Sequence, residues 1–243
     1  WLNIGVILGF LVLALHSKHL HIGAAPLNVL FSRRPNALGP LLPIYAGTQV
    51  LDFEDPSDDA TFGRGKIEDF TWKGNLDLLS CTECGRCQDQ CPAWNTGKPL
   101  SPKLMIMDLR DHLFAKAPYI LAGSDESKLD SFSAQVQAEV ARPMVGSHAD
   151  DPHASTDGYD EKGHRSHEGA VIDYDALWGC TSCGACVQQC PVDIEHVDHF
   201  MDLRRHQVLV ESEFPAELNG LFKNLETKGN PWGMNTSGRM TWI

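Results

Sequence analysis

An apolar run begins the chain. Residues 1–15 are apolar except for Asn3, and a polar stretch from His16 follows at once. A membrane-spanning helix needs about 20 apolar residues, whereas a helix on the surface of a soluble protein shows a polar face. Because this run has no polar face, we predict that residues 1–22 are the C-terminal part of a transmembrane helix; the alternative is a short buried or interfacial helix. The sequence begins at Trp1, inside the run, so we expect the chain to be a piece of a longer protein.

Prolines and helical periodicity divide the remainder. Five prolines interrupt residues 23–71, for which we predict a loop-rich cytoplasmic connection, because proline breaks long helices. Apolar positions at helical spacing predict helices at 101–116, around 129–142 and at 193–211. Residues 216–243 are predicted to be a linker to a missing C-terminal region. The fold class that we expect is therefore mainly α.

Local signals refine these elements. Ser101 before Pro102 is typical of a helix start, since serine caps a helix and proline fits its first position. In the third helix, His196 and His199 lie one turn apart beside Asp198, which favours a solvated or locally paired face over a proton relay. Irregular spacing favours a mobile surface loop, rather than a metal site, for four further histidines. These are His148, His153, His164 and His167.

Composition narrows the classes of partner. With 243 residues and 42% apolar content, the chain can bury one or two sizeable cores. Its 20 Lys and Arg stand against 32 Asp and Glu, which gives a net charge of -12. Nucleic-acid binding needs a basic patch, so we expect no nucleic-acid partner. A protein partner of complementary charge remains open.

The eight cysteines fall into two runs of one pattern, C-x2-C-x2-C-x3-C-P. In this pattern three thiolates bind one iron-sulfur cube and the fourth reaches the other cube. Paired C-x2-C units also bind zinc, but the third cysteine and the Cys-Pro ending are superfluous for zinc. We therefore predict two [4Fe-4S] clusters. The ligands expected are Cys81, Cys84, Cys87 and Cys190 for the first cluster, and Cys180, Cys183, Cys186 and Cys91 for the second.

The same residues indicate a location. Eight cysteines that all serve as thiolate ligands favour a reducing compartment over a disulfide-forming one. Lys18, Arg33 and Arg34 follow the apolar run, and positive charges after a membrane helix mark the cytoplasmic side. We therefore predict a protein of the cytoplasmic (inner) membrane with its clusters on the cytoplasmic side.

Two resemblances add to these inferences. The sequence Ser17-Lys18-His19-Leu20-His21-Ile22, followed by Pro26, resembles the end of a haem-bearing helix in membrane cytochromes b of the nitrate reductase gamma-subunit type. This resemblance implies that His21 is an axial ligand of haem b, with His16 as a weaker candidate. The alternative is that these histidines simply lie in the lipid headgroup layer.

The second resemblance concerns the cysteine runs. Residues 72–232 resemble the α-helical ferredoxin domain of heterodisulfide reductase C-type and glycerol-3-phosphate dehydrogenase C-type proteins. We assign residues 72–215 to this domain, with an insertion at 95–175. Behind a haem-bearing segment, the arrangement most resembles membrane-bound iron-sulfur electron-transfer-flavoprotein dehydrogenases. In that family Cys-Cys-Gly domains follow, and this sequence contains no Cys-Cys pair.

The resemblance implies an electron-transfer unit with no catalytic residues of its own. Electrons would pass from electron-transfer flavoprotein, or another flavoprotein donor, through two clusters to haem b and membrane quinone. One alternative keeps the relay but serves a glycerol-3-phosphate, hydroxy-acid or heterodisulfide oxidoreductase. An alternative of another class is a non-redox binding module whose clusters are only structural.

Overall fold

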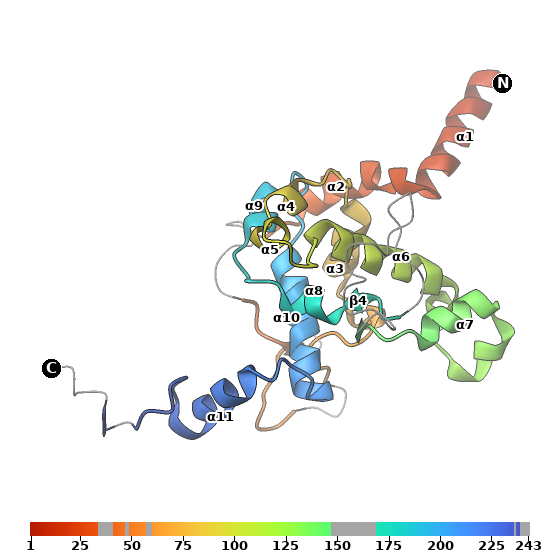
Figure 1. The fold of residues 1–243 in the computed structure, drawn as a ribbon. Coiled ribbons are helices and arrows are strands. Elements are labelled where there is room, and N and C mark those ends of the chain that lie inside the picture. The colour runs from red at the N-terminus through yellow and green to blue at the C-terminus, as the bar shows by residue number, and fades with distance from the viewer. Residues whose placement is uncertain (34–40, 47–48, 57–59, 147–168, 236, 239–243) are drawn as a thin grey trace.

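The computed structural model describes residues 1–33, 41–46, 49–56, 60–146, 169–235 and 237–238. Within these ranges the chain is mainly helical, as predicted, and carries two short pairs of strands (Figure 1). In chain order the elements are α1 (Leu2–Leu15), η1 (Lys18–Leu20), α2 (His21–Leu30), β1 (Tyr45–Ala46), β2 (Gln49–Val50), η2 (Ile67–Asp69), α3 (Trp72–Ser80), α4 (Arg86–Asp89), α5 (Pro92–Asn95), α6 (Pro102–Leu121), η3 (Glu126–Ser131), α7 (Ala134–Ala141), β3 (Val145–Gly146), β4 (Ile172–Asp173), α8 (Tyr174–Trp178), α9 (Ala185–Gln189), α10 (His196–His206), η4 (Gln207–Glu211) and α11 (Leu218–Lys228).

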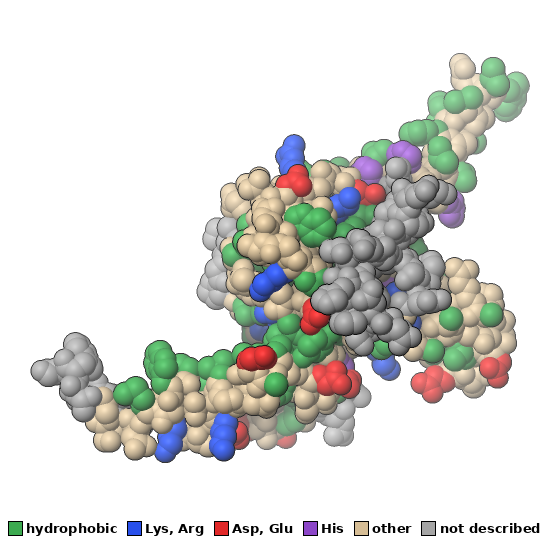
Figure 2. All heavy atoms as spheres, viewed as in Figure 1, with side chains coloured by type: hydrophobic (Ala, Val, Ile, Leu, Met, Phe, Trp, Pro, Cys, Tyr) green, Lys and Arg blue, Asp and Glu red, His purple; other side chains and the backbone are tan. Residues whose placement is uncertain are grey.

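Helix α1 projects away from the rest of the molecule (Figure 1) and buries none of its residues. Figure 2 shows hydrophobic side chains along it and histidines near its base. The single helix predicted for residues 1–22 is wrong. Ser17 has an extended backbone, and its hydroxyl accepts a hydrogen bond from the His19 amide, so a new turn begins there. Among the described residues, every helix is too short or too polar to cross a membrane.

Helix α2 corrects the predicted boundary between residues 22 and 23. It continues to Leu30 and contains Pro26, which the sequence suggested would end a helix. Proline removes one backbone hydrogen bond, but packing against α3 compensates for this loss. Asn28 is completely buried there, and its Nδ2 donates to Asp77 Oδ1 and to the Val192 carbonyl, both at 2.8 Å.

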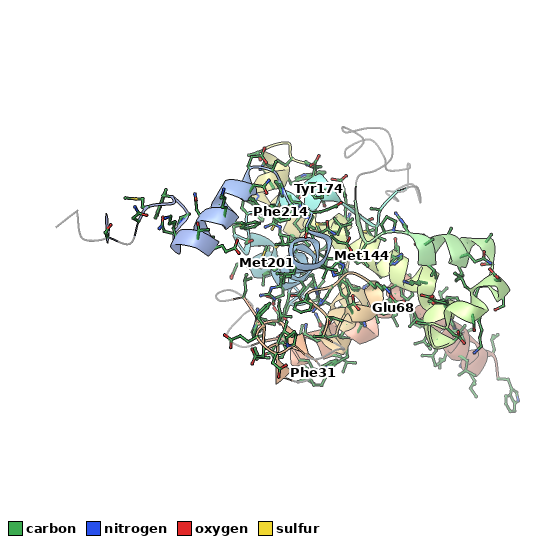
Figure 3. The ribbon with its side chains drawn as sticks, turned by 90° about the horizontal axis from the view of Figure 1, so that it is seen from below. Phe31, Glu68, Met144, Tyr174, Met201 and Phe214 are labelled. Carbon is green, nitrogen blue, oxygen red and sulfur yellow. The ribbon has the colours of Figure 1, made fainter. Side chains whose placement is uncertain are left out.

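The main core lies between α3, α6, α8 and α10. Figure 3 looks along α10 and shows side chains from the surrounding elements converging on it. Phe200 and Leu203 of α10 are fully buried against residues from the other helices. The buried members from those helices include Leu78, Met105, Ile106, Leu109 and Leu177. The insertion therefore contributes α6 to the same core that holds the cysteine runs.

The insertion begins and ends close to the core. Ser101 caps α6, since its hydroxyl accepts from the Leu104 amide, and Pro102 takes the first helical position, as predicted. The helix predicted around 129–142 is shorter, because Ser133 starts α7 after η3 has ended. Val145 then pairs with Ile172 in the parallel β3–β4 bridge, which joins the residues on the two sides of 147–168.

The C-terminal elements differ from the sequence expectation. Helix α10 ends in the π-helical turn η4, and the chain reverses at Ser212, which has a left-handed backbone. Residues 216–243 were predicted to be a linker, yet they contain the eleven-residue helix α11. Its apolar positions, from Leu218 to Leu225, recur at helical spacing, and Phe222 packs edge-on against Phe214. None of its residues is buried, and in Figure 1 it extends away from the core.

Candidate metal centres

The repeated cysteine runs have a repeated backbone. Gly85 (φ 81°) precedes α4, and Gly184 (φ 75°) precedes α9; both adopt the left-handed conformation that glycine tolerates best. The last cysteine of each run, Cys91 and Cys190, has φ −74° and ψ 118°. The sequence repeat is therefore also a structural repeat, in which a glycine turn and a short helix place the thiols.

Four cysteines line one cavity. Cys81, Cys84 and Cys87 come from the first run, and Cys190 comes from the end of the second. Lys103 and His196 also line this cavity. The structure thus brings together the four residues that the spacing predicted for the first cluster, although 102 residues separate Cys87 from Cys190 in sequence.

The other four cysteines are also neighbours. Burial raises the pKa of Cys180, and the charges of Cys91 and Cys183 raise it further, against a backbone hydrogen bond and Arg204 that lower it. Burial likewise raises the pKa of Cys186, and Cys180 and Cys91 are among its charged neighbours. Cys183 is exposed to solvent. Cys91 therefore lies with the second run and not with its own.

The two sets of thiols are suited to binding a group that contains metal cations. Burial raises the pKa of Cys87 to about 12, and neighbouring Cys81, Cys190 and Cys84 add to the rise. Four thiolates held together in a partly buried site repel one another, so they need a positive group to ionise. Iron supplies that charge, and an iron-sulfur cube accepts four cysteine thiolates.

Backbone amides point at two of the sulfurs. The Ser182 amide lies 3.4 Å from Cys180 Sγ, and the Ile194 amide lies 3.4 Å from Cys190 Sγ. Such N–H···S hydrogen bonds stabilise thiolate charge and are among the features that set cluster potentials. Among the described residues, no three His, Cys, Asp or Glu side chains form a group suited to a single metal ion.

The two thiol sets adjoin each other. Cys87 and Cys186, the third cysteines of the two runs, are buried in one small apolar cluster with Val187 and Val197. Helices α4 and α9, which carry these cysteines, pack directly together. The structure therefore has two metal-binding positions side by side with little solvent between their nearest ligands.

The prediction of a solvated face for His196 and His199 is wrong, whereas local pairing, the other part of that prediction, holds for His196, whose Nδ1 lies 3.0 Å from the Ile194 carbonyl oxygen. Both are buried, with 1% and 2% of their surface exposed. His199 Nε2 lies 3.0 Å from Asp77 Oδ2, and its Nδ1 lies 2.8 Å from Arg64 Nη1. Burial lowers the pKa of His196 to about 4, so this ring is neutral at physiological pH. His199 therefore ties α10 to residues far away in sequence, whereas His196 pairs with a carbonyl two residues away.

Asp77 was missed from the sequence. It is fully buried and binds four partners, of which Lys73 Nζ is the nearest at 2.7 Å; the others are His199, Asn28 and the Glu195 amide. The available signal was an isolated carboxylate within the otherwise apolar sequence 76–79. That signal shows burial but not which partners neutralise the charge.

The predicted haem ligands lie outside this region. His21 begins α2 and is half-buried, whereas His16 follows the last residue of α1 and is exposed. The structure does not test their role in binding haem. The four histidines predicted in a surface loop, His148 to His167, lie outside the described residues.

Comparison with known proteins supports the class of site. Residues 80–194, which contain all eight cysteines, match the model of the 4Fe-4S dicluster domain. Together with the two thiol sets, this match assigns two [4Fe-4S] clusters to the chain. The chain thus contains a two-cluster iron-sulfur domain of a mainly helical kind. No solved structure matches the chain.

Similarity to particular proteins extends over the whole chain. It is 39% identical over 242 residues to the "Probable iron-sulfur-binding oxidoreductase FadF" of Bacillus subtilis and 36% identical over 248 residues to the "EtfAB:quinone oxidoreductase" of Syntrophomonas wolfei. It is 35% identical over 229 residues to the "Probable membrane-anchored ferredoxin" of Chromohalobacter salexigens. These alignments cover 100%, 100% and 93% of this chain, but only 32%, 30% and 30% of the relatives. The chain therefore spans about a third of the length of the relatives it matches.

Proposed function

We propose that this chain is the two-cluster electron relay of a membrane-associated oxidoreductase. The observation that carries this proposal is that Cys87 and Cys186, one thiol from each site, belong to one small buried cluster. Iron-sulfur clusters exchange single electrons, and neighbouring clusters pass them on without forming or breaking bonds. The residues of this chain hold, separate and shield the two sites, and none acts as acid, base or nucleophile.

The ligand sets belong to this proposal. The first cluster is held by Cys81, Cys84, Cys87 and Cys190, and the second by Cys180, Cys183, Cys186 and Cys91. The cavity lined by the first four thiols supports the first set. The proximity of Cys91 to Cys180 and Cys186 supports the second. Residues 72–215 form the unit that binds both clusters, with the insertion at 95–175.

The electron donor that we propose is a reduced flavoprotein, with electron-transfer flavoprotein as the leading candidate. The support is the similarity to a relative named EtfAB:quinone oxidoreductase. The test is to mix each candidate donor with the purified, cluster-loaded protein and to monitor cluster reduction by the loss of cluster absorbance. Reduced electron-transfer flavoprotein should reduce the clusters and so decrease their absorbance. If only glycerol-3-phosphate, hydroxy-acid or heterodisulfide systems reduce the clusters, the flavoprotein donor is rejected and the relay serves one of those oxidoreductases.

The acceptors that we propose are haem b and membrane quinone. This proposal is supported by the exposed helix α1, which is apolar except for Asn3, and by the similarity to a relative named as a membrane-anchored ferredoxin. In this proposal the cytoplasmic membrane holds α1, and the clusters lie on its cytoplasmic side.

His21 would be an axial ligand of the haem, with His16 as the weaker candidate. His21→Ala should remove the low-spin haem spectrum from the full-length protein, because the iron loses one imidazole. His16→Ala is the matched control and should leave that spectrum in place. An unchanged spectrum in His21→Ala would reject His21 as a haem ligand and favour the alternative that it lies in the lipid headgroup layer.

A non-redox role for the clusters is the alternative of another class. Structural clusters hold the fold together and have no accessible reversible couple. A redox titration of the cluster-loaded protein distinguishes a relay from structural clusters, since a relay needs at least one couple that is reduced and reoxidised reversibly.

A further inference from the structure

The two thiol sets have different charged surroundings, although their backbones repeat. An arginine acts on the first cysteine of each run, since Arg110 lowers the pKa of Cys81 and Arg204 lowers that of Cys180, both against a larger rise caused by burial. The two arginines come from different helices, α6 and α10. What distinguishes them is how each positive charge is paired.

The charge of Arg110 is paired with carboxylates. Its Nη1 lies 2.8 Å from Glu83 Oε1, and its Nε lies 3.1 Å from Asp111 Oδ1. Glu83 belongs to the first cysteine run and lines the cavity of the first thiol set. The charge that Arg110 offers to Cys81 is therefore opposed by a carboxylate at the same place.

Arg204 has only neutral partners among the described residues. Its Nη2 donates to the carbonyls of Leu177 and Cys180, at 2.7 and 2.6 Å, and its Nε donates to Leu177 at 3.2 Å. The guanidinium carbon lies 4.9 Å from the centroid of the Trp178 ring. Burial lowers the pKa of Arg204, and the charge of Cys180 offsets part of this effect. In the part of the chain that the structure describes, a half-buried cation thus lies at the second thiol set with no carboxylate paired to it.

The repeat itself carries the same difference. Glu83 and Ser182 occupy the same position in the two runs and share a left-handed backbone, with φ 57° and 55°. The first run therefore has an acid where the second has a hydroxyl. Asp77 adds a further negative charge near Cys190.

Cations also lie near the first set. Lys103 lines its cavity, and Arg86 lies on α4. Arg86 is exposed, so solvent screens its charge. Charges of both signs therefore surround the first set, whereas Arg204 at the second set has no carboxylate partner among the residues that the structure describes.

We propose that Arg204 makes the site containing Cys180 the more easily reduced of the two, so that electrons in the relay pass from the Cys81 set to the Cys180 set. Adding an electron makes a cluster more negative, and a nearby partly buried cation stabilises that state. The transfer removes one electron from the first site and adds one to the second, with no proton or bond moved. This inference rests on the proposed relay and its ligand sets.

The test is a redox titration of the cluster-loaded protein, with each cluster followed by EPR. Arg204→Gln removes the charge and keeps one donor for the carbonyls. At a fixed ambient potential it should lower the reduced-to-oxidised ratio of the higher-potential cluster by about tenfold, which is about 59 mV for one electron. Arg204→Lys keeps the charge and should restore most of the ratio.

Two further variants identify the clusters and control for structural effects. Glu83→Gln removes the acid of the first run, so it should raise the potential of the lower-potential cluster. Arg142→Gln is the matched control, because Arg142 also donates to two backbone carbonyls, those of Gly169 and Ala170. It should leave both potentials unchanged.

Three results would overturn the inference. Equal shifts in Arg204→Gln and Arg204→Lys would show that the carbonyl contacts matter and the charge does not. A shift confined to the lower-potential cluster would reverse the proposed direction. If Arg204→Gln loses iron, a Glu83→Gln protein whose potentials equal those of the wild type overturns the charge asymmetry. A wild-type protein with no reversible couple would instead reject the relay itself, which keeps the two failures distinct.

Discussion

At the scale of single residues, Asp77 joins three helices. Its carboxylate binds Asn28 of α2, Lys73 of α3 and His199 of α10. Burial raises the pKa of Asp77, but the hydrogen bond and charge of His199, together with Lys73, outweigh burial and hold it below its ordinary value. The carboxylate is therefore ionised, and it fixes helices that also carry the ends of the cysteine runs.

Asp77→Ala should lower the free energy of unfolding by about 3 kcal/mol, because it leaves buried partners without their acceptor. Asp111→Ala, at a largely exposed carboxylate, is the control and should cost less than 1 kcal/mol. Denaturant unfolding of the two variants measures the difference. Equal losses would show that the buried network contributes nothing beyond surface pairing.

The pH dependence of this contribution has a definite sign. A carboxyl group whose pKa is lower in the folded state stabilises the fold above its unfolded pKa of about 4 and loses that effect as the pH falls further. The deficit of Asp77→Asn relative to the wild type should therefore be the same at pH 7 and pH 5. A deficit that halves between those values would contradict an ionised Asp77.

Cys190 tests the exchange of ligands between the two runs. Cys190→Ser should damage the cluster held by Cys81, Cys84 and Cys87, because its thiol lines their cavity. Cys183→Ser is the control and should damage the other cluster. Site-resolved EPR or Mössbauer spectra distinguish the two, and loss of only the Cys180-side cluster in Cys190→Ser would reject the proposed sets.

At the scale of elements, α1 projects away from the rest of the molecule (Figure 1). It is apolar on all sides and buries none of its residues. Removing residues 1–15 should abolish binding to phospholipid vesicles and leave the iron content unchanged. Removing 216–243, which deletes the exposed α11, is the control and should preserve vesicle binding. A truncated protein that still floats with vesicles, or that loses iron, would contradict this role for α1.

Local signals predicted some elements well and others poorly. Ser101 and Pro102 marked the start of α6, because capping and proline geometry depend only on neighbouring residues. Pro26 predicted a break that did not occur, since α2 packs along α3 and Asn28 is hydrogen-bonded across that contact. The break at Ser17 was missed because the predicted helix was extended from the apolar run across the polar residues 16–19, where a new turn begins.

The candidate site shows the same division. Fixed spacing was sufficient to predict that the eight cysteines bind two clusters, because the repeated run is typical of such sites. The assignment of each cysteine to one of the two clusters stays a prediction. The burial of His199 and its contact with Asp77 depend on how α3 and α10 pack, which no local pattern records. Arg204 was invisible for the same reason, since its contacts lie 24 and 27 residues away.

At the scale of the whole molecule, the fold brings two distant cysteine runs into one unit. The insertion between them packs α6 into the shared core, and β3 pairs with β4 where the chain returns. Cys87 and Cys186, one from each site, then lie in one small buried cluster. The relative positions of the runs are therefore fixed by the core, as electron transfer between two clusters requires.

The measurement that tests this account most directly is an EPR-monitored redox titration of the purified, cluster-loaded protein, with iron and acid-labile sulfide determined on the same sample. The account predicts four irons and four sulfides at each of two sites, and two reversible one-electron couples whose signals interact. A single cluster per chain, or two clusters without any reversible couple, would contradict it.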